Sequence, residues 1–433
     1  MNRTILFTLL SLLPLSGFAQ GLWQVTPLAD MPEPVSNNAV ATSGNYVFSF
    51  MGIDSTKVYS GIHLKGFRYD IANDTWDTIA PVPDNLSRIA ASASTVNGKI
   101  YIIGGYHVFQ NGNEVSSNKV FIYDPDSNSY TSGTNVGIAT DDHVQIVWKD
   151  SLIYVISGWS NTGNITAVQI YDPGQDTWTL GTSLPGGNDY KAFGASGVII
   201  GNTIYFTGGV TDTWVFSMIP KIRTGLIDPG NPAVITWSIA EDSLGMLYRS
   251  GAGILNGQPV WFGGADKAYN FDGIEYGSGL GVEPLNRVTT FDTTTATFSI
   301  EDGVIANFMD MRGIAQIDSN KYIIAGGMGP GQEVSAKTYL LEYVIPQAIG
   351  ENGGSAQHFS IHPNPASDYV QIQFKEKGKI NNWNITDITG RIVSQGQQIP
   401  SHGLSVRHLQ NGIYTLQITT DNQLLTAKFV RNK

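Results

Sequence analysis

Apolar and polar residues alternate along the chain in short runs, and the same kind of run recurs at a nearly constant interval. Each run ends in a pair of residues whose second member is glycine. The first residues of these pairs stand at positions 51, 104, 157, 208, 263 and 326. Alternation is typical of a β-strand with one buried face, and a period of this length provides for about four strands. The pattern therefore predicts six four-stranded blades of a β-propeller.

Each repeat carries further signals in a fixed order. A tight-turn dipeptide such as Asn97-Gly98 precedes the glycine pair, and a third strand ending in Tyr69-Asp70 or its equivalents follows it. An aromatic residue such as Trp76 then marks the fourth strand. These features resemble the kelch repeat over roughly residues 22 to 346. The resemblance implies an all-β fold, a six-bladed kelch-type β-propeller.

The sixth repeat stops without a fourth-strand aromatic residue. The segment 22–25, Leu-Trp-Gln-Val, looks like a fourth strand without a blade. We expect it to be the outermost strand of the last blade, because a closed ring leaves no free sheet edge. The propeller domain would then extend from residue 20 to residue 348.

A second domain is predicted after a polar, glycine-rich linker at residues 349–358. Short apolar runs between turn residues, at 369–374, 383–387, 413–418 and 425–430, predict a small β-sandwich. The segments 362–366 (HPNPA), 387–391 (DITGR) and 411–414 (NGIY) resemble the type IX secretion sorting domain of Bacteroidetes-like bacteria. The resemblance implies that residues 359–433 address the protein to the type IX secretion machinery, and so to the outer cell surface or the medium. A stabilising or carbohydrate-binding module is the alternative interpretation.

The N-terminus and the composition fit this destination. Arg3, an apolar run and small residues at 17 and 19 predict a signal peptide over residues 1–19, and no later segment is apolar enough to be transmembrane. The chain has no cysteine, so disulfides and thiolate metal sites are excluded. Residues 20–350 carry a net charge of −15, which makes nucleic acid an unlikely partner. We expect no cofactor and no metal.

Cationic residues recur where the chain leads into the first strand of a blade. Counted back from the glycine pairs, these positions hold Arg88, His143, Lys191, Arg249 and Arg312. The loops after the pairs, which we expect on the same face, add His107, Trp159, Asp266 and Lys267. Guanidinium groups bind carboxylates and sulfates, and aromatic rings stack on sugars. The sequence therefore predicts a cationic pocket for an acidic glycan or a protein partner. The alternative is that the arginines form ion pairs that tie the blades together.

An enzymatic interpretation uses part of the same set. For β-elimination from a uronate, Arg249 would neutralise the carboxylate while His143 or Tyr190 moves the proton. These residue types resemble those of propeller polysaccharide lyases, without a shared linear motif. A kelch-type sialic acid mutarotase is a weaker match, because no glutamate is expected on this face. We favour binding over catalysis.

Overall fold

The computed structural model describes residues 21–241, 246–345, 359–374, 380–387, 391–400, 402–420 and 424–432. The chain divides into two compact units, Met1–Pro346 and Gln347–Lys433. The signal peptide expected at residues 1–19 and the linker expected at 349–358 lie outside the described residues.

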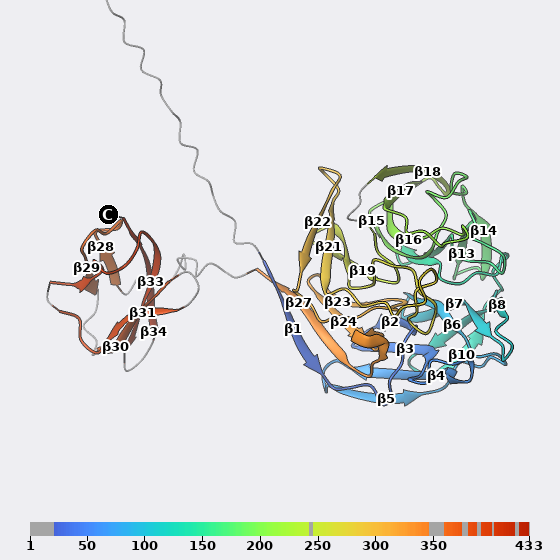
Figure 1. Ribbon diagram of the computed structural model, residues 1–433, viewed down its shortest axis with the longest axis horizontal. Coiled ribbons are helices and arrows are strands. Elements are labelled where there is room, and N and C mark those ends of the chain that lie inside the picture. Colours follow the sequence, from blue (N-terminus) through green and yellow to red (C-terminus); the bar gives the residue numbers. More distant parts are fainter. Residues whose placement is uncertain are drawn as a thin grey trace, which may run out of the picture. The chain divides into compact units, whose positions relative to one another are not determined.

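Six antiparallel sheets of four main strands build the first unit, and in each sheet the innermost strand is adjacent to those of neighbouring sheets (Figure 1). The first three blades, from the innermost strand outwards, are β2 (Ala39–Ser43), β3 (Tyr46–Ile53), β4 (Ile62–Asp70) and β5 (Thr75–Ile79); β6 (Ile89–Val96), β7 (Lys99–Val108), β9 (Val120–Asp124) and β10 (Ser129–Ser132); and β11 (Val144–Trp148), β12 (Leu152–Ile156), β13 (Val168–Asp172) and β14 (Thr177–Leu180). In blade two, β8 (Glu114–Ser116) adds to β7.

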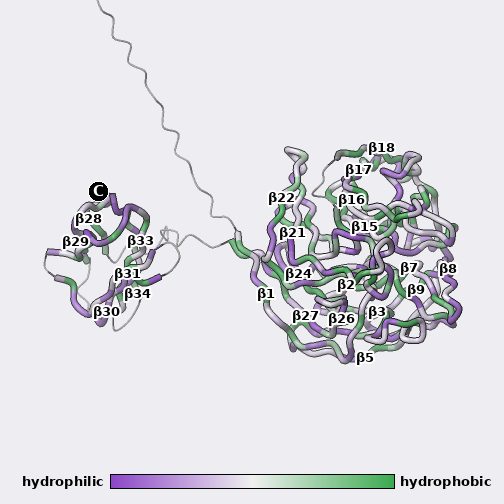
Figure 2. Tube along the Cα trace, in the orientation of Figure 1, coloured by the Kyte–Doolittle hydropathy of each residue, from purple (hydrophilic) through white to green (hydrophobic). Residues whose placement is uncertain are grey.

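The other three blades follow the same order. They are β15 (Phe193–Ile200), β16 (Thr203–Val210), β17 (Lys221–Asp228) and β18 (Asn231–Glu241); β19 (Gly251–Leu255), β20 (Gln258–Phe262), β21 (Arg287–Asp292) and β22 (Thr297–Asp302); and β23 (Ala315–Asp318), β24 (Lys321–Ala325), β27 (Thr338–Val344) and β1 (Leu22–Leu28). The short strands β25 (Met328–Gly329) and β26 (Glu333–Val334) form a separate hairpin. Hydrophobic and hydrophilic positions interleave along the strands, as expected for sheets packed face to face (Figure 2).

The glycine pairs mark the end of the second strand in each blade. Both members of every pair have a positive φ, for example 68° at Gly104 and 87° at Gly105. A Cβ atom on Gly104 would lie 2.2 Å from the carbonyl oxygen of Thr140 in the next blade. The first glycine thus meets two demands, a left-handed backbone and a close approach between blades.

Aromatic residues fasten neighbouring blades at the periphery. In blade one the Tyr69 hydroxyl donates to Asp74 Oδ1 at 2.6 Å, and the same carboxylate accepts the backbone N–H of Ala29 at 2.7 Å. The indole N–H of Trp76 donates to the carbonyl oxygen of Ala29 at 3.0 Å. Blade two has the equivalent hydrogen bond, from the Tyr123 hydroxyl to Asn128 Oδ1. The Tyr-Asp turn and the trailing aromatic residue are therefore parts of one joint between blades.

The sixth sheet is built from both ends of the propeller. Strand β1 pairs with β27 along its whole length, and Trp23 lies opposite Tyr343. The indole ring packs edge-on against Phe262 of blade five, with ring centroids 5.3 Å apart. The first strand of the unit thereby supplies the outer edge of the last blade and joins the two ends of the ring.

The second unit consists of two small antiparallel sheets. One contains β28 (Phe359–His362), β29 (Tyr369–Phe374) and β32 (Leu404–Ser405); the other contains β31 (Ile392–Gly396), β30 (Ile380–Thr386), β33 (Gly412–Thr420) and β34 (Leu424–Arg431). Val370 of the first sheet and Leu416 and Phe429 of the second belong to one buried core. The predicted fold class, a six-bladed propeller followed by a small β-sandwich, is confirmed.

Candidate functional site in the top face of the propeller

Six residues form a ring around the propeller axis where the chain enters the innermost strands; we call this side the top face. All have a positive φ, and they are Asn37, Ala90, Asp142, Gly194, Arg249 and Asp310. Backbone hydrogen bonds join successive members: the N–H of Asp142 donates to Ala90 at 3.0 Å, and that of Gly194 donates to Asp142 at 2.9 Å. These backbone contacts draw the blades together at the axis.

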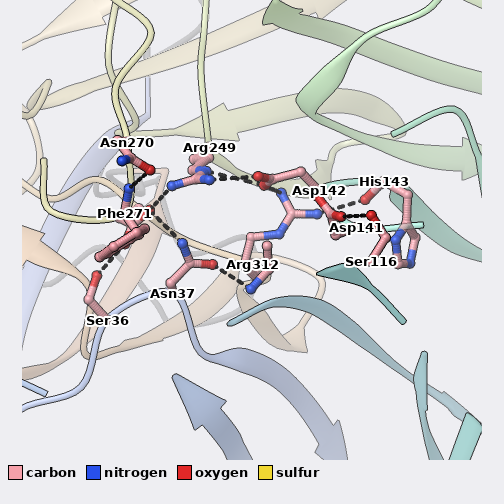
Figure 3. A network of polar contacts seen from close by, with 12 residues as sticks. Ser36, Asn37, Ser116, Asp141, Asp142, His143, Arg249, Asn270, Phe271 and Arg312 are labelled. Carbon is pink, nitrogen blue, oxygen red and sulfur yellow. Dashed lines mark hydrogen bonds and ion pairs between the residues drawn. The ribbon is translucent and has the colours of Figure 1, made fainter. Parts of the chain in front are cut away.

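The side chains of the axial ring bind one another. Arg249 donates from Nε and Nη2 to both carboxylate oxygens of Asp142, at 3.1 and 2.6 Å, and from Nη1 to Asp310 at 2.8 Å. Asp310 also accepts hydrogen bonds from Ser36 at 2.6 Å and from Asn37 at 3.1 Å. Figure 3 shows Arg249 and Arg312 converging on Asp142. Each nitrogen of the Arg249 guanidinium therefore already has a carboxylate partner.

Charge pairing decides the protonation of the axial carboxylates. Burial alone would raise the pKa of Asp142, but Arg249 and Arg312 hold it below its ordinary value. Burial also opposes the charge of Arg249, yet the neighbouring carboxylates, Asp142 foremost, raise its pKa well above the usual range. Burial outweighs Arg249 at Asp310, whose pKa is raised. The network therefore combines two buried guanidinium groups, of Arg249 and Arg312, with two buried carboxyl groups, of Asp142 and Asp310.

A long loop of blade five reaches the axial ring. Residues 263–286 connect β20 to β21, and within this loop Phe271 packs against Ile53, Ile89 and Tyr106 of blades one and two. The guanidinium of Arg249 lies 5.6 Å from the ring centre of Tyr269 in the same loop. Figure 3 includes Asn270 and Phe271 of this loop in the view of the Arg249 network. Arg249 is 1% exposed.

The cationic residues expected around one pocket mostly have acidic partners in the structure. Arg249 and Arg312 are bound to Asp142 on the axis, and Arg88 bonds within its own blade to Asp84 at 2.9 Å and to Gly104. Lys191 pairs with Asp212 at 2.7 Å. The ring positions equivalent to Arg249 hold other residue types in the remaining blades, namely Asn37, Ala90, Asp142, Gly194 and Asp310.

The remaining predicted residues are dispersed. His107 contacts the carbonyl oxygen of Ser87 at 2.8 Å and the ring of Phe109, and Tyr190 packs against the hydrophobic core that contains Ala192. Asp266 and Lys267 are exposed, and Lys267 pairs with Glu275 at 3.4 Å. Of the lyase set, Arg249 binds Asp142 and Asp310, and Tyr190 is partly buried against a core.

His143 and Arg312, two of the predicted site residues, both line a cavity of about 130 Å³ on the propeller axis. Its Nε2 lies 3.1 Å from Gln145 Oε1, and Gln145 Nε2 donates to the carbonyl oxygen of Tyr101, which orients the amide. Burial, followed by the charge of Arg312, lowers the pKa of His143 to about 4. The imidazole is therefore neutral near pH 7.

A larger pocket opens on the top face between blades two and three. Its volume is about 240 Å³. We call it the top-face pocket, and its lining is Tyr106, Gly112, Asn113, Glu114, Ser116, Asp141, Trp159 and Asn161. Of the residues predicted from the sequence as site residues, Trp159 lies here. No cationic side chain is part of this lining.

Local structure fixes the polar wall of the top-face pocket. Strands β7 and β8 form a hairpin that carries Asn113 and Glu114, and Ser116 at its end donates to Asp141 Oδ2 at 2.6 Å. The backbones of Asp141 and Trp159 exchange two hydrogen bonds of 3.0 and 2.9 Å. Blade two thus supplies the hairpin and blade three supplies the aromatic residue.

Other aromatic rings pack against Trp159. Its ring centroid lies 5.5 Å from Phe193 and 6.0 Å from Phe216, and Phe216 lies 4.6 Å from Tyr276. Packing of this kind restricts the rotamer of an aromatic side chain. Trp159 therefore presents a fixed surface to the top-face pocket.

Two carboxyl groups give the pocket its chemistry. Burial raises the pKa of Asp141 well above the usual range, and the charges of Asp142 and Glu114 add to this. Desolvation by the surrounding protein, followed by the charge of Asp142, also raises the pKa of Glu114 at the rim. Burial thus favours the protonated form of Asp141, and a protonated carboxyl both donates and accepts hydrogen bonds.

Sequence reasoning did not select Tyr106, Asn113, Glu114, Ser116 and Asn161. The available signal was length: blade two has an extra turn, Asn111-Gly112-Asn113, between its glycine pair and its third strand. An insertion at the binding face of a repeat fold is a usual place for function.

Family models match two parts of the chain. The kelch motif matches residues 87–137, and the secretion system C-terminal sorting domain matches residues 360–432. The chain is a kelch-repeat protein with a secretion sorting domain. This domain directs the kelch protein to secretion or to the cell surface through the type IX system. Among the described residues, no helix has the length and hydrophobicity needed to span a membrane.

Curated relatives match parts of the propeller. Kelch-like protein 15 of Danio rerio is 27% identical over 175 residues, which is 36% of this chain and 28% of the relative. Beta-scruin of Limulus polyphemus is 29% identical over 168 residues, which is 37% of this chain and 18% of the relative. The kelch protein thus spans less than a third of the length of each of these two relatives.

A solved structure supports the fold. The structure titled "Structure of YjhT" has a TM-score of 0.59 and 16% sequence identity, and the match covers 80% of this chain and 99% of that one. At this identity the likeness concerns the fold alone.

Proposed function

We propose that the secreted kelch propeller binds neutral carbohydrate in its top-face pocket. The observation that carries the proposal is the pairing of a fixed aromatic surface, Trp159, with hydroxyl-binding groups of Asn113, Glu114 and Asp141 in one pocket. Sugars present a face of C–H groups, which stacks on an aromatic ring, and a rim of hydroxyls, which need polar partners.

The size of the pocket suits a small ligand. Its volume of about 240 Å³ is below the roughly 300–1,000 Å³ of pockets that enclose drug-sized molecules. One sugar ring is therefore a better occupant than a protein segment. The remainder of a longer saccharide would leave the pocket over its rim.

Charge favours a neutral saccharide over an acidic one. The acidic glycan expected from the sequence depended on accessible arginines, and Arg249 and Arg312 bind Asp142 instead. Glu114 and Asp141 line the pocket, and any carboxylate brought beside them would be repelled to the extent that they are ionised. An uncharged ligand meets no such cost.

A saccharide panel tests the proposal on the purified chain from residue 20 to residue 433, called the mature chain here. The panel contains oligosaccharides of xylan, β-glucan, mannan and galactan, together with uronate-containing and sialylated ones. We expect binding of a neutral member, about tenfold or more weaker in Trp159→Ala because the stacking surface is lost. Leu180→Ala, on the exposed outer strand β14, is the matched control and should bind normally.

Two further variants sharpen the outcome. Asn113→Ala should weaken binding without changing the melting temperature, because its side chain lies at the exposed rim. Glu114→Gln should improve binding of the uronate members relative to neutral ones. Binding that survives Trp159→Ala, or preference of the wild type for acidic saccharides, would contradict the proposal. Release of saccharide products would indicate an enzyme instead of a binding module.

A further inference from the structure

Trp214 stands out on the top face by its exposure. Its side chain is 98% exposed, and the adjacent Val215 is 62% exposed. Both belong to the loop 211–218, which follows the glycine pair of blade four as Trp159 follows that of blade three. Single exposed hydrophobic residues are common, but two adjacent ones at the tip of an ordered turn require a reason.

The turn that presents Trp214 is well built. The N–H of Phe216 donates to the carbonyl oxygen of Thr213 at 2.9 Å, which closes a four-residue turn with Trp214 and Val215 at its corners. At the base, the backbone N–H of Thr211 donates to Ser217 at 2.9 Å, and Thr211 Oγ1 accepts the N–H of Ser217 at 3.1 Å. The exposure of Trp214 is therefore imposed by the geometry of the loop.

The same turn packs against Trp159, the aromatic residue of the top-face pocket. Phe216, at the end of the turn, has its ring 6.0 Å from that of Trp159 and 4.6 Å from that of Tyr276. Two residues of chain span about 7 Å at most, so the backbone of Trp214 is no farther than that from Phe216. Phe216 thus links Trp159 of the pocket to the turn that carries Trp214 at its tip.

We propose that Trp214 is a second stacking site, which holds a further ring of the saccharide chain whose first ring fills the top-face pocket. The inference rests on the proposed function and deepens it, because it makes the ligand an oligosaccharide or polysaccharide. The nearby carboxylate of Asp212 is paired with Lys191 at 2.7 Å, so its charge is compensated next to Trp214. A protein partner would need about 1,200 Å² or more of complementary surface, which a single turn does not offer.

The test compares saccharide lengths on the mature protein. Oligomers of one, two, four and six units from xylan, β-glucan, mannan and galactan are titrated by calorimetry into wild type, Trp214→Ala, Trp214→Phe and the control Leu180→Ala. For the series that binds, Trp214→Ala should weaken the tetramer and hexamer about 2- to 12-fold, as expected for the loss of one ring contact. It should leave the monomer unchanged. Trp214→Phe should retain most of the affinity.

The outcomes separate the two proposals. Equal affinity of wild type and Trp214→Ala for every length, with binding still lost in Trp159→Ala, would overturn the second stacking site and leave the pocket intact. Equal weakening of monomer and hexamer would also overturn it, because the effect would then arise inside the pocket. Absence of binding to any oligomer would overturn both proposals. Since Trp214 makes up the tip of an exposed turn, its variants should fold as the wild type does.

Discussion

Replacement of Arg249 by methionine should destabilise the propeller strongly, whatever the ligand. The guanidinium is 1% exposed and bridges Asp142 and Asp310, so its removal leaves two carboxylates buried. Asp142 keeps Arg312 at 3.2 Å, whereas Asp310 keeps only the neutral donors Ser36 and Asn37. Loss of one partner from a buried ion pair costs about 3–5 kcal/mol in the free energy of unfolding. In a domain of this size that corresponds to roughly 5–10 °C in melting temperature.

Scanning calorimetry of the mature chain measures this effect. The control is Arg287→Met, which breaks an exposed pair with Asp302 and should cost less than about 1 kcal/mol. Asp310→Asn in the Arg249→Met background should recover part of the loss, because it removes the stranded charge. A melting temperature within 2 °C of the wild type, measured on well-folded Arg249→Met, would refute the conclusion that the axial network is structural.

Three further predictions concern the fold. Gly104→Ala should lower the free energy of unfolding more than Gly98→Ala does. Both glycines have a positive φ, but a Cβ at Gly104 would lie 2.2 Å from Thr140, whereas at Gly98 nothing lies within 4 Å. Chemical denaturation of the two variants measures this, and a larger loss in Gly98→Ala would contradict the prediction. Trp23→Ala should cost up to about 3 kcal/mol, because this partly buried side chain loses its contact with Phe262, and the N-terminal strand should become more sensitive to protease. A strand of unchanged protease sensitivity would argue against ring closure. Burial and the charge of Arg312 lower the pKa of His143 in the folded chain to about 4, so the unfolded chain takes up the proton first and stability falls as pH drops from about 6.5 towards 4. His143→Gln should remove up to about 3 kcal/mol of this fall in the free energy of unfolding. A variant whose stability changes with pH as the wild type's does would contradict this assignment.

Much of the fold could be predicted because its determinants are local and repeated. The pair Gly104-Gly105 recurs because each blade needs a left-handed backbone at the same point, and Tyr69 with Trp76 recurs because each joint between blades needs the same clamp. Such requirements leave similar residue types at a similar spacing, so a single sequence displays the pattern in repeated copies, although Met51 and Ser157 replace the first glycine in two of them. The sorting domain was equally recognisable from its turn motifs.

The candidate site could not be predicted in the same way. The sequence reasoning chose the cationic or histidine residue 14 to 17 positions before each glycine pair, which selected His143 and Arg312 although Asp142 and Asp310 are the ring members. A count of cations also does not show their partners: Arg249 meets Asp142 from 107 residues away. The site depends on non-local contacts, such as Phe271 of blade five beside Tyr106 of blade two, which no local pattern encodes.

Amide hydrogen exchange tests the location of ligand binding most directly. The mature chain is measured alone and saturated with the tightest-binding neutral saccharide of the panel. The account predicts slower exchange in residues 106–116 and 159–161, which border the top-face pocket, and no change around Arg249 and Arg312. Protection confined to the residues around Arg249 and Arg312, with residues 106–116 unaffected, would contradict it and return the binding site to the axis.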